Sequence, residues 1–381
     1  MHTAFIQFVR QYFQRPEGPV PLHQASTGEE ELQQLQACLA SGQLSSVGPM
    51  VTDFEEQLAR ELQLPYAVAT SSGTAALHLA LLTVGLQPGE LVITTPFTFV
   101  ATCHAIRYCG AEPLFVDIAR NSLGLCPEAL LSFLEAETEA REDGCYHRAS
   151  GRRIRLCLPV CAFGHSPALD RLSNICDAYQ LGMIVDVAEA LGSTYREKPA
   201  AAWGDASVLS FNGNKIITCG GGGMLLTQDA ALADRARHLS QQARRQKGMY
   251  TTYDAVGYNY RMPALNAALG LGQLPRLAAR TQALQQLAKA YRDFFRPYGL
   301  TVVEAPHGTT SNYWQQSVIF PGPEAREAFL AYTRRHELDC RPAWTLMSEL
   351  PVYRDCLSAE LPNAQWAARH IALLPSLTSY T

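Results

Sequence analysis

One lysine of this sequence has neighbours that are unusually small and pliable. Lys215 lies in SFNGNKIITCGGGGM, residues 210–224, after an asparagine–glycine turn that starts at Asn212 and before the glycine run Gly220–Gly223. A lysine that forms a Schiff base needs a flexible stem, a partly desolvated amine and small neighbours that admit a flat ligand. The stretch meets the last need. A solvent-exposed turn with an incidental charge is the alternative.

Two other chemistries of lysine- and glycine-rich loops do not fit this stretch. A P-loop requires Ser or Thr directly after the lysine and a helix beyond it, whereas Ile216 follows here and no helical pattern comes next. A dinucleotide fingerprint opens a helix, whereas this glycine run precedes a strand-like segment. These two exclusions leave covalent chemistry at Lys215 as a possible function of the stretch.

A second stretch has the composition of an anion site. In YAVATSSGTAALHLALL an apolar strand runs into Ser71, Ser72, Gly73 and Thr74, and we expect a helix to start at about Ala75. Free backbone N–H groups and the helix dipole at such a start favour phosphate. Ordinary N-capping by Ser or Thr is the alternative.

Two acids follow an apolar strand in GMIVDVAEALGS. Asp186 ends the strand, which places it at the carboxyl edge of an open parallel sheet, where ligands bind. Glu189 follows three residues later and is expected to face the same crevice, although Asp186 could instead simply cap the next segment. A phosphate seat, an acid, Ser210 and Lys215 together are what pyridoxal phosphate requires, because the acid keeps the pyridine nitrogen protonated.

The elements that must position these residues alternate between strand and helix. Short apolar runs followed by helical patterns predict an α/β fold with a mostly parallel sheet covered on both faces. From about Ala230 the pattern becomes helical and then α+β, and HTAFIQFVRQYFQ at the start predicts an amphipathic helix on the body or on a neighbouring subunit. We expect an N-terminal helical segment over 1–40, a large domain over 41–270 and a small domain over 271–381.

Composition excludes several classes of protein. The 381 residues are 47% hydrophobic and carry a net charge of −4, which gives no electrostatic reason to expect a nucleic acid or an anionic membrane as partner. No apolar run reaches the roughly 18 residues of a membrane span. Eleven scattered cysteines without C-x-x-C or zinc spacing predict reduced, buried thiols in a cytoplasmic protein and no metal site.

The sequence resembles the DegT/DnrJ/EryC1/StrS family of sugar aminotransferases, which are fold type I (aspartate aminotransferase-like) enzymes dependent on pyridoxal phosphate. Within it the chain looks most like the LegC-like and UDP-bacillosamine-type 4-aminotransferases. The resemblance runs from Val20 to Ser376 and rests on several motifs in order: SSVGPMVTDFEEQLA, SSGTAALHLAL, TPFTFVAT, VDVAEALGS, SFNGNKIIT and VGYNYRMPALNAALG. Cys219 and Gly221 depart from the glycine and glutamate of many relatives.

The resemblance implies roles for individual residues. Lys215 carries the cofactor as a Schiff base, Asp186 pairs with the pyridine nitrogen and Glu189 lies near the 3-hydroxyl of the ring. Phe99 stacks on the ring, although its type alone would predict a core residue. Asn259, a turn residue by type, reaches the phosphate of a second subunit, which implies a homodimer with shared active sites. The phosphate contacts within one chain are Gly73, Thr74, Ala75 and Ser210.

The resemblance also implies the reaction. Glutamate would load the cofactor, converting it to pyridoxamine phosphate, and the amino group would pass to C4 of a UDP-linked 4-keto-6-deoxy-N-acetylhexosamine, with Lys215 moving the proton. Candidate substrate residues are Asn212, Arg341 for the donor carboxylate or the sugar, and Arg244, Arg245 and Lys247 for the diphosphate across the dimer interface. A solvated helix end is the alternative for the last three.

Three other functions are weighed against this one. Amination at C3 is possible within the same family. A dehydratase on the same fold carries histidine at the lysine position, so Lys215 argues against it. A non-catalytic regulatory protein that binds the cofactor would be credible if the lysine or the acid were lost, and both Lys215 and Asp186 are present.

Overall fold

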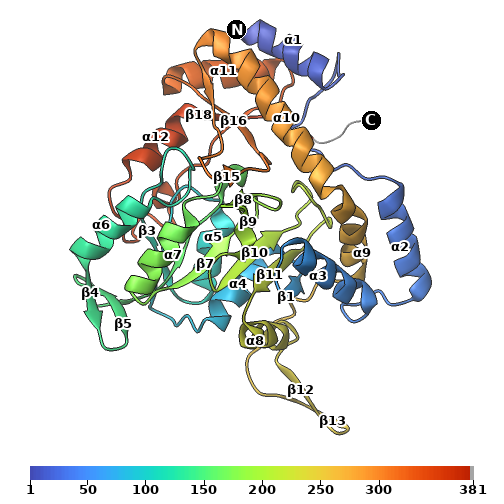
Figure 1. The fold of residues 1–381 in the computed structure, drawn as a ribbon, viewed down its shortest axis with the longest axis vertical. Coiled ribbons are helices and arrows are strands. Elements are labelled where there is room, and N and C mark those ends of the chain that lie inside the picture. Colours follow the sequence, from blue (N-terminus) through green and yellow to red (C-terminus); the bar gives the residue numbers. More distant parts are fainter. Residues whose placement is uncertain (378–381) are drawn as a thin grey trace.

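The computed structural model describes residues 1–377, and a large central sheet forms its body (Figure 1). The strands of this sheet are β1 (Tyr66–Thr70), β2 (Leu91–Thr94), β3 (Glu112–Phe115), β4 (Thr138–Arg141), β5 (Gly144–His147), β6 (Arg153–Leu158), β7 (Gly182–Asp186), β10 (Ala206–Ser210) and β11 (Gly223–Thr227). Their order is β1-β11-β10-β7-β6-β2-β3, and β4 and β5 form a hairpin beside β6.

The sheet is parallel through its centre and antiparallel at one side. Strands β10, β7, β6, β2 and β3 are paired in parallel, whereas β11 runs antiparallel to both β10 and β1. The segment 211–222 between β10 and β11 contains no helix. A parallel return usually runs through a crossover helix, whereas this twelve-residue segment has none and leads into an antiparallel strand. The reversal of β11 was not predicted.

Helices cover both faces of the sheet. Two separate apolar cores show this, one formed with α4, α5 and α8 and the other with α3, α6, α7 and α9. A sheet buried on both faces explains why its strands read as continuous apolar runs. The helices are α3 (Pro49–Glu61), α4 (Gly73–Thr83), α5 (Val100–Tyr108), α6 (Pro127–Glu137), α7 (Leu169–Ala178), α8 (Ala230–Ser240) and α9 (Ala264–Gln273).

A smaller α+β unit lies above the large sheet in Figure 1. Its antiparallel sheet has the order β14-β16-β18-β17. The unit and its helices comprise α10 (Leu277–Phe295), β14 (Thr301–Val302), β16 (Gln316–Ile319), α11 (Pro323–Arg335), β17 (Arg341–Pro342), α12 (Pro362–His370) and β18 (Ile371–Leu374). The boundary predicted near residue 270 falls inside α9, and α10 continues from there into this unit.

The N-terminal segment divides between the two units. The helix α1 (His2–Tyr12) packs on the small unit, where the Phe5 ring lies 5.4 Å from that of Phe295 and 5.0 Å from that of Phe329. The helix α2 (Glu29–Ser41) packs instead on α9. The expected amphipathic helix is therefore confirmed, and it lies on the body of its own chain.

Two helix boundaries differ from the sequence expectations: the start of α4, by two residues, and the helix end considered for Arg244, Arg245 and Lys247. Helix α4 starts at Gly73 rather than Ala75, because the cap is Ser72, whose Oγ accepts a hydrogen bond from the Ala75 amide. Helix α8 ends at Ser240, and 244–253 form an exposed hairpin of β12 (Arg244–Lys247) and β13 (Tyr250–Tyr253). Gln242 and Ala243 have positive φ, a conformation that a right-handed helix does not accept.

Two further features bear on the composition. All eleven cysteines are unpaired and eight of them are buried, as the sequence predicts. Among residues 1–377 no helix combines the length and the apolar character needed to cross a bilayer.

Candidate active site

A cavity of about 480 Å³ opens where the carboxyl ends of β7 and β10 meet the start of α4. Strands β7 and β10 are parallel neighbours, with Val208 in register with Asp186, so residues that follow both strands reach the same edge. The strand order therefore brings the acid and the lysine together. The predicted residues that line the cavity are Gly73, Thr74, Phe99, Asp186, Glu189, Ser210, Asn212, Lys215 and Arg341.

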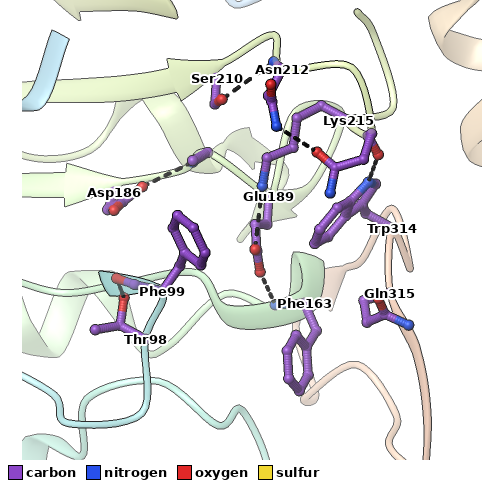
Figure 2. Close-up of polar contacts among 12 residues, drawn as sticks. Thr98, Phe99, Phe163, Asp186, Glu189, Ser210, Asn212, Lys215, Trp314 and Gln315 are labelled. Carbon is purple, nitrogen blue, oxygen red and sulfur yellow. Dashed lines mark hydrogen bonds and ion pairs between the residues drawn. The ribbon is translucent and has the colours of Figure 1, made fainter. Parts of the chain in front are cut away.

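Lys215 extends from the segment between β10 and β11 into this cavity (Figure 2). Its Nζ lies 3.3 Å from Glu189 Oε1 and 4.1 Å from the centroid of the Trp314 ring. Its side chain is only 12% exposed. The other three lysines of the chain, Lys198, Lys247 and Lys289, are exposed. One amine is thus confined in a space lined by aromatic rings.

Glu189 is held on both of its oxygens. Oε1 pairs with Lys215, and Oε2 accepts a hydrogen bond of 2.8 Å from the Phe163 amide. Phe163 adopts φ 59°, a left-handed conformation that a bulky residue rarely takes, so the short helical turn Ala162–Gly164 aims this amide at the carboxylate at some cost. Burial raises the pKa of Glu189, and the Lys215 charge opposes that rise.

Asp186 lies at the floor of the cavity and is 4% exposed. Its Oδ2 accepts a hydrogen bond of 2.8 Å from Thr102 Oγ1, and its Oδ1 accepts one of 3.1 Å from the Ala188 amide. Burial raises the pKa of its carboxyl, while these two donors and the charge of Lys215 oppose the rise. A buried carboxylate that is only partly compensated gains from a cationic N–H donor placed beside it.

The start of α4 lies at the same cavity. Ser72 Oγ accepts a hydrogen bond from the Ala75 amide. The first two amides of the helix, those of Gly73 and Thr74, therefore do not donate to this cap. A Cβ on Gly73 would lie 2.8 Å from the Cβ of Ser210, so only glycine allows the helix start to approach that strand. The helix dipole and the neighbouring hydroxyl of Ser210 suit a phosphate group.

Aromatic rings form the walls of the cavity. Phe99 is 59% exposed and projects into the space near Asp186 and Lys215 in Figure 2. The Trp314 ring contacts the Lys215 amine, and it also stacks in parallel with the His23 ring, with 4.5 Å between the two ring centroids. Burial lowers the pKa of His23 to about 4, so it is neutral near pH 7.

These features fit pyridoxal phosphate. The group combines a phosphate, a flat aromatic ring with a basic nitrogen, and an aldehyde. The residues at the cavity offer a helix start for the phosphate, the Phe99 ring for the flat face, Asp186 for the nitrogen and the Lys215 amine for the aldehyde. The fit rests in particular on Asp186, a buried carboxylate at the cavity whose hydrogen bonds come from the Thr102 hydroxyl and the Ala188 amide and not from a charged group.

Five of the predicted residues do not line the cavity. Ala75 is engaged in the helix cap, and Asn259 forms an isolated backbone bridge with Gln241. The other three lie on the exposed hairpin of β12 and β13, so the alternative of a solvated helix end is wrong in its secondary structure; these are Arg244, Arg245 and Lys247.

Sequence reasoning missed several residues of the site. Thr102 holds Asp186 and lies on α5, three residues after Phe99, within the motif TPFTFVAT. Trp314 and His23 are far from the site in sequence, and their types suggest only core packing. The position of Trp314 two residues before the strand β16 is the one signal that places it at a sheet edge.

Comparison with known proteins agrees with this geometry. The model of the DegT/DnrJ/EryC1/StrS aminotransferase family matches residues 25–381. The GDP-perosamine synthase of Escherichia coli O157:H7 is 30% identical over 363 residues, covering 94% of each chain. A UDP-4-amino-4-deoxy-L-arabinose–oxoglutarate aminotransferase from Shewanella sediminis is 32% identical over 314 residues, covering 80% of this chain and 76% of that protein.

The fold has close counterparts among solved structures. The crystal structure of the aminotransferase TlmJ from Streptoalloteichus hindustanus superposes with a TM-score of 0.86 and 25% identity, over 96% of this chain and 95% of that one. This confirms the expected fold type I architecture. By the family model, the relatives and the fold together, the chain belongs to the DegT/DnrJ/EryC1/StrS aminotransferase family and is a pyridoxal phosphate-dependent aminotransferase.

Proposed function

We propose that this enzyme transfers an amino group from L-glutamate to C4 of a nucleotide-linked 4-keto-6-deoxy sugar, with a UDP-linked N-acetylhexosamine as the preferred substrate. The observation that carries the proposal is the pair of Lys215 and Asp186 at one cavity, both shielded from water. The relatives that aminate GDP- and UDP-linked sugars support the nucleotide sugar, and the oxoglutarate in one name supports glutamate as donor.

The residues of the chain divide the work of the reaction. Bound pyridoxal phosphate supplies an electron sink that makes a carbon acid next to its nitrogen accessible. Asp186, held by Thr102 and Ala188, keeps a positive charge at the pyridine nitrogen. Lys215, once free as an amine, takes a proton from one carbon and returns it to another, as base and then acid. Glu189 lies 3.3 Å from that amine and stabilises it while it is protonated.

The walls of the cavity suit the two substrates. Arg341 lies at its rim, where it pairs with Asp339 at 2.8 Å and remains 60% exposed on its side chain, so it is available to a carboxylate or to a sugar oxygen. Asn212 lines the same cavity and its Nδ2 donates to Asn214. We propose both as substrate residues.

We propose further that two chains share each active site. The hairpin of β12 and β13 extends from the body in Figure 1 and carries Met249 and Tyr250, which are 94% and 78% exposed. Such apolar exposure favours an interface. Asn259 follows this hairpin in the sequence, two residues before Arg261. We propose that its side chain contacts the cofactor phosphate bound by the second subunit. The diphosphate of the substrate would then be met by Arg244, Arg245 and Lys247 of the second chain.

Two experiments test the proposal. The visible absorbance of the holoprotein should shift on addition of glutamate, and an unchanged spectrum would contradict a transaminase with this donor. The glutamate-treated protein should then aminate 4-keto nucleotide sugars, identified by mass and NMR. Product from a 3-keto sugar alone would favour amination at C3. Loss of a sugar hydroxyl without nitrogen gain would favour a dehydratase, a function that the presence of Lys215 opposes.

A further inference from the structure

Three polar side chains behind the cavity lie seven residues apart and contact the same segment. Asn266 and Gln273 belong to α9, and Arg280 lies in the first turns of α10. Helix α9, a short 3-10 turn (Leu274–Arg276) and α10 follow one another without a break. Seven residues are close to two helical turns, so these side chains share one face. That face is turned toward the segment 212–222, which carries Lys215, and we call the three side chains the ladder.

Each member of the ladder binds the backbone of the lysine segment. Arg280 Nη1 donates to the carbonyl of Ile216, the residue after Lys215, at 2.9 Å. Gln273 Oε1 accepts a hydrogen bond of 3.3 Å from the Thr218 amide. Asn266 Nδ2 donates to the carbonyls of Cys219 and Gly221, at 2.7 and 3.2 Å. Four residues of the segment, 216, 218, 219 and 221, are thus held by side chains rather than by regular structure.

The segment needs such support because it contains the glycine run. Gly220 and Gly222 have φ of 73° and 147°, values that favour glycine. Glycine gains this freedom at a cost, since it loses more conformational entropy on ordering than any other residue. A cofactor lysine on an unsupported glycine segment would sample many positions, whereas chemistry requires one.

A buried charge network holds the ladder in place. Glu31 on α2 is 1% exposed, accepts a hydrogen bond of 2.6 Å from Gln273 Nε2 and lies 3.9 Å from Arg280 Nη2. Arg280 is itself only 6% exposed and also donates to the Ser26 carbonyl at 2.7 Å. Burying a charge pair seldom adds stability compared with apolar residues of the same volume. The network is better explained by the geometry that it fixes.

We propose that Asn266, Gln273 and Arg280 are positioning residues that fix the backbone on which Lys215 stands. They touch neither the cavity nor the reacting atoms, and they act through hydrogen bonds to 216–221. Their importance to the reaction rests on the proposed role of Lys215, whereas the restraint of the segment is a property of the chain alone.

The test measures amide hydrogen exchange in the cofactor-free protein. Arg280→Met removes the bond to Ile216. Its matched control is Arg276→Met on the preceding turn, since Arg276 also pairs with Glu30 and Glu31 and, among the described residues, has no recorded bond to 212–222. We expect the amides of Thr218 and Cys219 to exchange about tenfold faster in the Arg280 variant and at the wild-type rate in the control, the factor that one lost hydrogen bond predicts.

A second variant covers the case in which Arg280→Met fails to fold. Asn266 is half-buried, and Asn266→Asp keeps its shape while replacing the donor with a carboxylate beside two carbonyl oxygens. The same increase in exchange is expected. Wild-type exchange at 216–222 in Asn266→Asp or in a folded Arg280 variant, or an equal increase in the Arg276 control, would overturn the proposal.

A spectroscopic measurement links the ladder to the lysine. In the holoprotein, the visible absorbance of Asn266→Asp should titrate with pH at a different midpoint from wild type, whereas that of Arg276→Met should not. An unchanged midpoint together with faster exchange would overturn the link to Lys215 and leave its proposed attachment to the cofactor standing. That attachment is tested separately by chemical mapping, so the two failures are distinguishable.

Discussion

Removal of one hydroxyl should show what keeps Asp186 ionised. Thr102 is 1% exposed and donates to Asp186 Oδ2 at 2.8 Å, so Thr102→Val deletes one of the two hydrogen bonds to this carboxylate with little change in volume. A hydrogen bond to a charged group contributes about 1.5–3 kcal/mol, and one pH unit corresponds to about 1.36 kcal/mol. The pKa of Asp186, already raised by burial, should rise by roughly one to two further units.

The sign of the effect follows from which form binds the cofactor. Only ionised Asp186 favours a protonated pyridine nitrogen, so affinity should fall as pH drops through the pKa of this carboxyl. Raising that pKa moves the fall to higher pH, by about one to two units, and leaves affinity at high pH unchanged. Titration of the cofactor-free protein with pyridoxamine phosphate between about pH 5 and 9 measures the shift, because this form of the cofactor makes no Schiff base with Lys215.

A matched control lies one helical turn away. Thr98 is also fully buried, and its Oγ1 lies 2.9 Å from Thr102 Oγ1, but it does not reach Asp186. Thr98→Val should therefore retain the wild-type profile. Superimposable profiles for Thr102→Val and wild type, or equal shifts for both valine variants, would refute the assignment of Asp186 to the pyridine nitrogen.

Three further predictions concern the other groups of the cavity. Lys215→Ala should lower turnover at least about a thousandfold while pyridoxamine phosphate still binds, as measured by kinetics and titration; retained turnover would count against its role. Because burial raises the pKa of Asp186 in the folded state, the unliganded protein is penalised for ionising it as pH rises above the ordinary value. Asp186→Asn should therefore unfold at a higher temperature than wild type near pH 7, without cofactor, and the gain should vanish near pH 4; a variant less stable at pH 7 would contradict this. Trp314→Ala removes a cation–π contact of about 1–2 kcal/mol with Lys215 and should lower kcat roughly 5- to 30-fold, whereas Trp314→Phe should retain most of it; equal losses would argue against the contact.

Much of the site was predictable because its residues follow strands. Asp186 and Ser210 end two apolar runs, and parallel neighbours in a sheet bring such ends together without any knowledge of side-chain contacts. Lys215 was recognisable from its small neighbours and from the failure of the phosphate-loop patterns. The start of α4 was predicted within two residues, since the Ser–Ser–Gly–Thr cluster leaves more than one possible cap.

The rest depends on contacts between distant parts of the chain. His23 and Trp314, from two loop segments, converge with Thr102 of α5 at the cavity, and each is an ordinary core residue by type. The ladder of Asn266, Gln273 and Arg280 shows a seven-residue spacing, yet polar residues at that spacing usually mark a solvated helix face. In this protein the three side chains instead bind the backbone of the lysine segment, and only the tertiary structure reveals that contact.

The central claim is that Lys215 alone forms a covalent bond with the cofactor. Reduction of the holoprotein with borohydride fixes the Schiff base, and mass spectrometry of the peptides locates it among the four lysines of the chain. The account predicts one modified peptide, the one that contains Lys215, and no such adduct in Lys215→Ala. An adduct at Lys198, Lys247 or Lys289 with Lys215 unmodified, or no adduct at all in a protein that has taken up the cofactor, would contradict it.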